Sequence, residues 1–271
     1  MNISEWLRSA TRQLKEIGIE SSRLDAELIL SHTLHKPRTY LHAHLDDKID
    51  QRHKDIADAR LQLRLERVPI AYITGHKEFY GRRFKVTPAT LIPRPESENI
   101  IHTLLAASSN EITPKTLIDI GTGSGALAIT AKLERPHLAV TASDISDKAL
   151  AIAKENAKIH NTNIYFRNMN LLNNHAGPID YLIANLPYVD KDWVDTSPEL
   201  KHEPSIALYA QNKGLDLINK LLPQAQRWLT DKGILLLEAD PSQHESIIKE
   251  ARKHDLKHVQ TKGYCLALVK N

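Results

Sequence analysis

Residues 119–125 read Asp-Ile-Gly-Thr-Gly-Ser-Gly, and they close a short apolar run that begins at Leu117. Glycines at such a point let the backbone turn tightly and approach a ligand without clashes from Cβ atoms. The helical pattern that follows would leave the unpaired N–H groups of a helix N-terminus beside the loop. Asp144 ends the next apolar run, where a carboxylate can accept both hydroxyls of a ribose. The stretch therefore predicts a strand, a glycine loop and a helix that bind a nucleotide-like cofactor.

Ala126 leaves the identity of that cofactor open. The spacing Gly121-x-Gly123-x-x-Ala126 also satisfies the Gly/Ala form of the dinucleotide-binding fingerprint. On the loop alone, a nicotinamide-dependent oxidoreductase is an alternative. A tight strand-to-helix turn that binds nothing is another.

Strand-length apolar runs alternate with helical patterns after residue 115. The runs are Leu117–Ile120, Leu138–Ala142, Tyr181–Ala184 and Ile234–Leu237, with shorter candidates near Tyr165 and at Leu266–Val269. Such alternation predicts an α/β domain with a doubly wound, mostly parallel sheet of the Rossmann-like type.

A helical pattern precedes residue 75. One apolar stripe contains Trp6, Ala10, Leu14 and Ile17 and stops at Gly18; a second contains Leu24, Leu28 and Leu34; a third, between about Asp50 and Glu66, contains Ile56, Ala59 and Leu63. Short amphipathic helices bury such stripes only against each other, which predicts a small helical bundle.

The sequence changes character between the bundle and the α/β domain. Residues from Ile70 to Thr87 are rich in aromatic and β-branched side chains and are broken by Gly75 and Gly81, which predicts a ribbon or hairpin. We therefore expect a helical bundle domain over residues 1–75, a β-hairpin linker over 76–90 and the α/β domain over 91–271.

The composition is that of an ordinary folded protein. Hydrophobic residues make up 41% and charged residues 25% of the 271 positions, which excludes a largely disordered chain. No apolar run approaches the roughly 18 residues of a membrane span, and the N-terminus lacks the apolar core of a signal peptide. The single cysteine, Cys265, cannot form an internal disulfide, and the 14 histidines have no cysteine or carboxylate cluster at metal-ligand spacing. We expect a cytoplasmic protein without a metal site.

The sequence Asn185-Leu186-Pro187-Tyr188 directly follows an apolar run, at the edge of the predicted sheet where open α/β folds bind substrates. The Asn185 side-chain oxygen can accept one N–H of a planar amino group, and the Leu186 backbone carbonyl can accept the other. Tyr188 can stack on the flat group and fix its plane. The nitrogen would then face a methyl donor in line, and such positioning is worth about 7–11 kcal/mol when alignment is good.

Together these features resemble the class I S-adenosylmethionine-dependent methyltransferases, and within them the release-factor glutamine methyltransferases. The motifs that carry the resemblance are Pro69–Gly75, Glu78–Gly81, Leu91–Glu96, Asp119–Gly125, Asn185–Tyr188 and Glu203-Pro204. The first three lie outside the general methyltransferase core and so favour this family. The resemblance implies N5-methylation of the glutamine in the Gly-Gly-Gln motif of peptide chain release factors, with an N-terminal helical domain that helps dock the release factor.

The resemblance also implies a role for each site residue. Gly121, Thr122, Gly123, Ser124 and Gly125 would line the methionine end of S-adenosyl-L-methionine, Asp144 would hold its ribose, Asn170 and Leu171 its adenine, and Asn185, Leu186, Pro187 and Tyr188 the substrate glutamine. Asn185 would also border the cofactor, and Asn185 and Tyr188 would be the catalytic residues. Neither a metal nor a covalent intermediate is needed, because the sulfonium leaves without help.

Two positions depart from the family's pattern. Leu186 stands where the family usually has proline, and the freed φ angle is worth roughly 0.4–1 kcal/mol of pre-organisation. Asn170 stands where an aspartate is usual, and its amide oxygen can still accept from the adenine amino group.

Asn-Leu-Pro-Tyr also resembles the motif of adenine-N6 dimethyltransferases of ribosomal RNA. An adenine-N6 methyltransferase acting on RNA or DNA is thus an alternative, and a non-catalytic binding protein on the same scaffold is another. A net charge of only +3, with no Lys/Arg-rich element beside the motif, argues against direct nucleic-acid binding. We expect a monomer that acts on a protein.

Overall fold

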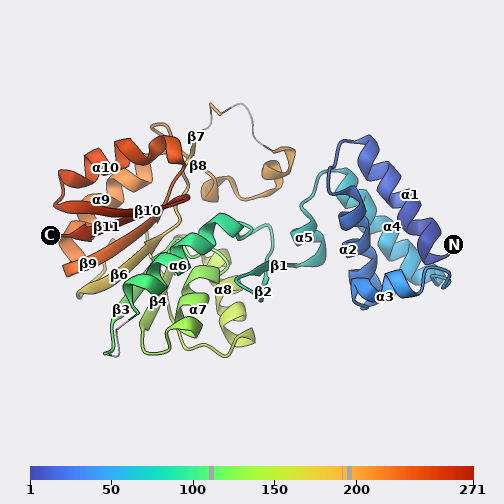
Figure 1. Ribbon diagram of the computed structural model, residues 1–271, viewed down its shortest axis with the longest axis horizontal. Coiled ribbons are helices and arrows are strands. Elements are labelled where there is room, and N and C mark those ends of the chain that lie inside the picture. Colours follow the sequence, from blue (N-terminus) through green and yellow to red (C-terminus); the bar gives the residue numbers. More distant parts are fainter. Residues whose placement is uncertain (110–112, 191, 194–196) are drawn as a thin grey trace. The chain divides into compact units, whose positions relative to one another are not determined.

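The computed structural model describes residues 1–109, 113–190, 192–193 and 197–271 (Figure 1). The chain forms two compact units. The first comprises Met1–His76 and Ser197–His202, and the second comprises Lys77–Thr196 and Glu203–Asn271. Within the described ranges, no helix is long and apolar enough to cross a membrane.

The first unit is a helical bundle, as the sequence predicts. Its helices are α1 (Ile3–Glu16), α2 (Ser22–Leu34), α3 (Arg38–Ala43), α4 (Gln51–Leu65) and α5 (Ile70–Thr74). Helix α1 begins with a capping box, in which Asn2 and Glu5 exchange two hydrogen bonds of 2.8 Å. Its buried side chains, including Trp6 and Leu14, pack with those of α2 and α4 in one apolar core.

The predicted apolar stripe of α4 is wrong, and that of α2 is wrong at Leu24 although its Leu34 packs against the core. Leu24 in α2 is 41% exposed, and Ile56 and Leu63 in α4 are 37% and 44% exposed. The buried side of α4 instead carries Ala57, Leu61 and the charged Arg64, whose guanidinium Nε lies 2.7 Å from Oδ2 of the equally buried Asp25. A pattern of large apolar residues does not reveal this side, because only Leu61 on it is large and apolar.

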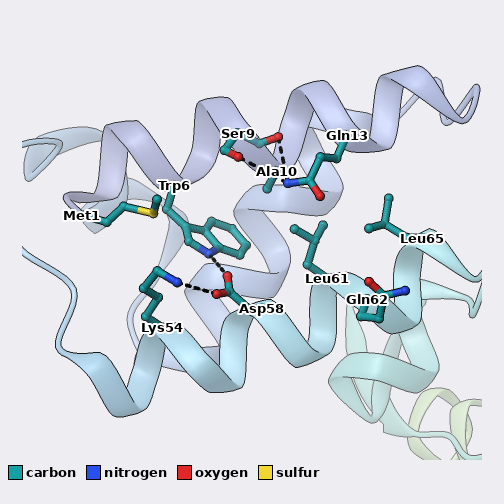
Figure 2. A pocket seen from close by; sticks show the side chains of 10 residues that line it. All are labelled: Met1, Trp6, Ser9, Ala10, Gln13, Lys54, Asp58, Leu61, Gln62 and Leu65. Carbon is teal, nitrogen blue, oxygen red and sulfur yellow. Dashed lines mark hydrogen bonds and ion pairs between the residues drawn. The ribbon is translucent and has the colours of Figure 1, made fainter.

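A cavity of about 300 Å³ is lined by Met1 and by residues of α1 and α4, and Figure 2 shows the side chains that line it. At one end Trp6 Nε1 donates to Asp58 Oδ1 at 2.7 Å, and Lys54 Nζ lies 2.6 Å from Asp58 Oδ2. The Trp6 hydrogen bond links α1 to α4, and Lys54, on α4 itself, contacts the second oxygen of Asp58. None of the sequence-predicted site residues lines this cavity, and all of them belong to the second unit.

The expected ribbon over Ile70–Thr87 is wrong at its start. Residues Ile70–Thr74 form the short helix α5, which follows Pro69 and ends at Gly75 with φ of 75°. Only the later residues are extended, as strands β1 (His76–Phe79) and β2 (Arg82–Lys85), which pair in a two-stranded sheet.

The second unit contains a seven-stranded sheet in the order β10-β11-β9-β6-β3-β4-β5. Its strands are β3 (Thr116–Ile120), β4 (Ala139–Asp144), β5 (Tyr165–Asn168), β6 (Ile179–Ala184), β9 (Leu229–Glu238), β10 (Leu256–Lys262) and β11 (Cys265–Lys270). Strands β5, β4, β3, β6 and β9 are parallel, whereas β11 is antiparallel to both β9 and β10. The predicted doubly wound, mostly parallel fold is confirmed.

Helices cover both faces of this sheet (Figure 1). They are α6 (Glu98–Ala107), α7 (Ala126–Glu134), α8 (Asp147–Ile159), α9 (Asp216–Trp228) and α10 (His244–Arg252). Successive side chains of a strand point to opposite faces. Accordingly, Leu117 joins the core beneath α6 and α7, and Ile118 and Ile120 join the core beneath α9 and α10.

Short elements complete the fold. These are η1 (Pro95–Ser97), η2 (Pro198–His202), η3 (Ser205–Ala207), η4 (Pro241–Gln243), β7 (Val189–Asp190) and β8 (Tyr209–Ala210).

The register of the strands determines which loops lie next to each other. Ile120 pairs with Ser143 and Ala184, and Ala184 pairs with Leu237. The ends of β3, β4, β6 and β9 therefore lie at one edge of the sheet.

Candidate active site

A cavity of about 230 Å³ opens at this carboxyl edge. Eight of the sequence-predicted site residues line it, namely Gly121, Gly123, Asp144, Asn170, Leu171, Asn185, Leu186 and Pro187. Asp144 is the last residue of β4, and the others come from the loops that follow β3, β5 and β6, so the parallel topology gathers them. Thr122, Ser124, Gly125 and Tyr188 are not among the residues that line it.

The glycine loop is shaped by Asp119, at the end of β3. Asp119 Oδ2 accepts from Thr122 Oγ1 at 2.7 Å and from the Ala128 backbone N–H at 3.2 Å, which ties the loop to the start of α7. Its second oxygen, Oδ1, is buried and has no hydrogen-bond partner in the described parts of the chain. Complete burial raises the pKa of Asp119 to about 7. Thr122 thus acts on the shape of the loop.

Gly121 and Gly125 allow close packing at the two ends of the loop. A Cβ atom on Gly121 would lie 3.3 Å from Leu186 Cδ2 and 3.7 Å from the Asn185 backbone oxygen. One on Gly125 would lie 3.0 Å from Ile129 Cδ1, and both glycines have positive φ. The absence of a side chain at Gly121 lets the loops after β3 and β6 meet beside the cavity.

Asp144 is anchored by backbone groups on two sides. Its Oδ2 accepts from the Gly123 N–H and its Oδ1 from the Ser146 N–H, each at 2.9 Å. Burial raises the pKa of this carboxyl, and the backbone hydrogen bonds act in the opposite direction. A carboxylate has about four acceptor sites, so each oxygen can still accept from a ligand hydroxyl in the cavity.

Aliphatic side chains line the part of the cavity that contains Leu171. Leu171 is buried, with φ of 51°, and Asn170 beside it is exposed. Ile145 and Ile206 also line the cavity, and their side chains are 51% and 62% exposed. Such exposed aliphatic side chains, together with the amide of Asn170, suit a flat, partly polar ring.

The loop after β6 is held from beneath by residues of other elements. Asn185 Nδ2 donates to Ser97 Oγ at 3.0 Å, which leaves the amide oxygen as an acceptor. Tyr188 donates its hydroxyl to Glu238 Oε1 at 3.1 Å, and its backbone oxygen accepts from Gln243 Nε2 at 2.8 Å. Burial and Glu238 raise the pKa of Tyr188, so it stays a phenol at neutral pH.

Sequence reasoning assigned no role to three buried residues at this edge. Glu203 accepts the Ile92 backbone N–H at 3.0 Å and pairs with Arg94, so it fixes the motif Leu91–Glu96 beside the cavity. Ser97 and Glu238 support the Asn185 loop. Glu238 could have been found in the sequence, because it is an acidic residue directly after the apolar run Ile234–Leu237. No sequence pattern singles out Ser97.

Residues of a glycine loop, a carboxylate on the next strand and the first three residues of an Asn-x-Pro-Tyr motif line one cavity, and this combination defines an S-adenosylmethionine-dependent methyltransferase. Residues 98–203 match the family model of the methyltransferase small domain, and residues 5–75 match that of the PrmC N-terminal domain. The fold is similar to that of a methyltransferase from Pyrococcus furiosus, with a TM-score of 0.52, 18% identity and coverage of 79% of this chain and 98% of that one. It is also similar to a 16S rRNA methyltransferase of T. thermophilus solved with AdoMet and guanosine, with a TM-score of 0.54, 12% identity and coverage of 72% and 49%.

Relatives that match over most of their length identify the methyltransferase family to which the chain belongs. It is 35% identical over 253 residues to the release factor glutamine methyltransferase of Deinococcus radiodurans, covering 93% of this chain and 91% of the relative. It is 37% identical over 256 residues to that of Coxiella burnetii, covering 92% and 89%. The chain belongs to the release factor glutamine methyltransferase family.

The residues present fit the cofactor of this family. The glycine loop, the Asp144 carboxylate and the apolar end with Asn170 and Leu171 offer a backbone cradle, a hydroxyl acceptor and a ring site in one cavity. Among the residues that the structure describes, no three His, Cys, Asp or Glu side chains gather as a metal site.

Proposed function

We propose that this chain transfers the methyl group of S-adenosyl-L-methionine to the side-chain amide nitrogen, N5, of the glutamine in the Gly-Gly-Gln motif of peptide chain release factors. The sulfur–methyl bond breaks as the nitrogen–methyl bond forms, so S-adenosyl-L-homocysteine and one proton, lost from the methylated amide nitrogen, are the other products. One observation carries the proposal: the glycine loop and residues Asn185–Pro187 line the same cavity, in a chain whose full-length relatives are named for this reaction.

The chemical problem is a nitrogen whose lone pair is delocalised into its own carbonyl. Asn185 Oδ1 and the Leu186 backbone oxygen would accept the two N–H groups of the glutamine amide, and Tyr188 and Pro187 would fix its plane. Positive charge develops on the nitrogen as the new N–C bond forms, so these two hydrogen bonds strengthen toward the transition state. Alignment and hydrogen bonding are therefore the main contributions of the chain.

The other site residues would hold the cofactor, which supplies an electrophilic methyl group when bound. The backbone of Gly121–Gly125 would contact its methionine end, with Thr122, Ser124 and Gly125 acting through the shape of the loop. Asp144 would accept from the ribose hydroxyls, while Asn170 would accept from the adenine amino group and Leu171 would cover its ring. Asn185 would border both the cofactor and the substrate glutamine.

Each part of the chain would have its own role. Residues 1–75 would dock the release factor, residues 76–90 would link the two domains as a β-hairpin, and residues 91–271 would catalyse the methyl transfer. We also propose that the chain acts as a monomer in the cytoplasm and does not bind nucleic acid directly. The small net charge of +3 supports the last point.

Labelled S-adenosyl-L-methionine tests the proposal directly. The purified chain is incubated with the labelled cofactor and a matched release factor, a second release factor in which the Gly-Gly-Gln glutamine is replaced, and ribosomal RNA. Mass spectrometry then maps the methyl group. We expect label on the glutamine and none on the replaced variant. Label on the RNA alone would favour the adenine-N6 alternative, and no label with cofactor still bound would favour the non-catalytic one.

A further inference from the structure

Asn156, on α8, is completely buried and makes three hydrogen bonds to the backbone of two distant segments. Its Oδ1 accepts from the Lys85 N–H at 2.8 Å, and its Nδ2 donates to the Lys85 oxygen at 2.9 Å and to the Ser124 oxygen at 2.8 Å. Lys85 is the last residue of β2, and Ser124 belongs to the glycine loop. One side chain that does not line the cavity therefore contacts both the hairpin and the loop.

The three backbone partners match the hydrogen-bonding groups of an asparagine. A side-chain amide has an oxygen that accepts and a nitrogen with two protons to donate. The Lys85 N–H needs an acceptor, and the two carbonyl oxygens need donors. A half-turn of the amide would set its nitrogen against the N–H and its oxygen against both carbonyls, and an aspartate of the same length would supply acceptors only. The orientation of Asn156 is therefore fixed by the backbone that it contacts.

The Ser124 oxygen is one end of the peptide group that closes the glycine loop. At the other end of this peptide group, the Gly125 N–H donates to the Thr122 oxygen at 2.8 Å, as in a β-turn. Glycine tolerates both signs of φ, so a peptide group beside Gly125, whose φ is +82°, turns over easily unless both ends are held. Thr122 holds the N–H end, and Asn156 holds the carbonyl end.

Close packing brings α8 within reach of the loop. A Cβ atom on Gly125 would lie 3.2 Å from the Cβ of Ala153, which stands three positions before Asn156 on the same side of the helix. Ser146 and Ala149, at the start of α8, are among the residues that line the cavity. The helix therefore borders the cavity at its first turn and supports the glycine loop from behind at its later turns.

We propose that Asn156 is a positioning residue for cofactor binding: it holds the Ser124–Gly125 peptide group, and with it the glycine loop, in the form that receives the methionine end of S-adenosyl-L-methionine, and it joins this loop to β2. This inference rests on the proposed function and adds to it the origin of the shape of the loop. Without Asn156, the buried Ser124 oxygen would lose this donor and the loop would adopt other arrangements. The affinity for the cofactor would then fall with the fraction of chains that keep the binding arrangement.

Cofactor affinity and turnover of Asn156→Ala distinguish positioning from general support. We expect the Kd of S-adenosyl-L-methionine to rise about tenfold, within the range for a buried carbonyl left without a donor. The kcat at saturating cofactor should stay within about twofold, because the chain that has bound the cofactor has the same loop. A smaller folded fraction alone would lower kcat and leave the Kd unchanged, and that result would overturn the proposal.

Glu155→Gln is the matched control. Glu155 is the neighbour of Asn156 on α8, and its carboxylate pairs with Lys85 Nζ at the surface, where the two side chains are 49% and 43% exposed. The control thus weakens a contact between the same helix and the same strand residue without removing the hydrogen bond to the loop. We expect its Kd to stay within about twofold of that of the unmodified chain. Equal rises in Kd in Glu155→Gln and Asn156→Ala would overturn the role of the loop contact.

Hydrogen exchange in the unmodified chain tests the same link without a substitution. S-adenosyl-L-methionine should slow exchange of the Lys85 N–H about five- to tenfold, in the range of coupled sites, because an ordered loop also holds Asn156. The Thr116 N–H is the control, since it too donates to a side chain, Asp180 Oδ2 at 2.9 Å, and its exchange should slow less. Equal slowing at both would contradict the link. A chain that shows these effects and labels no release factor would support the inference and contradict the proposed function.

Discussion

The carboxylate of Asp144 accepts the backbone N–H of Gly123 at 2.9 Å, so the acidic residue that ends β4 also fixes the middle of the glycine loop after β3. Neighbouring parallel strands make this contact geometrically natural, because Ile120 pairs with Ser143 in the sheet. The proposed acceptor for the ribose and the loop proposed to hold the methionine end of the cofactor are therefore joined by one hydrogen bond, so a change at Asp144 affects both.

Asp144→Ala should weaken cofactor binding through both effects. It removes the proposed ribose acceptor and frees the Gly123 N–H, so we expect the Kd of S-adenosyl-L-methionine to rise on the order of 10- to 100-fold, which matches the about 1.5–3 kcal/mol of a charge-assisted hydrogen bond. Isothermal calorimetry measures it. Asp147→Ala is the matched control, because Asp147 is a nearby exposed carboxylate bonded to Asn168 Nδ2 at 2.7 Å. Equal affinity in Asp144→Ala and the unmodified chain would rule out the ribose role.

Asn185→Ala should lower kcat and leave the affinity for the cofactor almost unchanged. It removes one acceptor for the substrate amide and leaves the glycine loop intact, so kcat should fall by about 10²–10³, the usual loss for one preorganised hydrogen bond at a reacting centre. The Kd of S-adenosyl-L-methionine should stay within about threefold. Methyl transfer to a release factor is the assay, and exposed Asn163→Ala serves as control. Retained turnover would refute the proposed role of Asn185.

Most of the second unit was predictable from the sequence because its site follows apolar strands. Strands β3, β4 and β6 are buried runs, and parallel pairing brings the residues after them to one edge. Strand β10 was not predicted, since most of its side chains are exposed and its pairing is supplied by β11.

Contacts between distant segments were not predictable in the same way. Ser97 and Asn185 are separated by 88 positions, and no periodicity links them. In the first unit, the buried side of α4 includes Arg64, which pairs with the buried Asp25, and an apolar pattern does not count a buried arginine. Both cases depend on tertiary partners, whereas patterns report only the local preference of a helix or strand.

Stability should depend on pH through Asp119. Burial raises its pKa from 3.8 to about 7, so between these values the folded chain keeps a proton that the unfolded chain releases. The free energy of unfolding contributed by this group therefore falls as pH rises from about 4 to 7. Asp119→Asn cannot titrate and keeps an oxygen to accept from Thr122 and Ala128.

The Tm difference between Asp119→Asn and the unmodified chain should consequently shift in favour of the variant as pH rises through that window. We expect a change of several degrees, because 1 kcal/mol corresponds to about 2–4 °C in a domain of this size. Thermal unfolding followed by circular dichroism at pH 4, 5, 6 and 7 measures it. A Tm difference that does not vary with pH would show that Asp119 does not titrate there.

Gly214 should be intolerant of a side chain because of Tyr188. A Cβ atom at Gly214 would lie 1.9 Å from the Tyr188 backbone oxygen and 2.5 Å from Gln243 Nε2, which donates to that oxygen. Gly214→Ala must therefore move the loop that carries the proposed substrate motif, in addition to straining its own φ of +80°.

Gly177→Ala isolates the backbone strain, because Gly177 has φ of +99° and nothing within 4 Å of its Cβ position. We expect Gly177→Ala to cost on the order of 1 kcal/mol of unfolding free energy and Gly214→Ala about 1–3 kcal/mol more from overpacking. Only Gly214→Ala should also lower kcat, since only that substitution displaces Tyr188. Urea unfolding and methyl-transfer rates of the two variants provide the comparison. Equal losses of stability would mean that the Tyr188 loop moves aside freely, and Tyr188 would then not be held for catalysis.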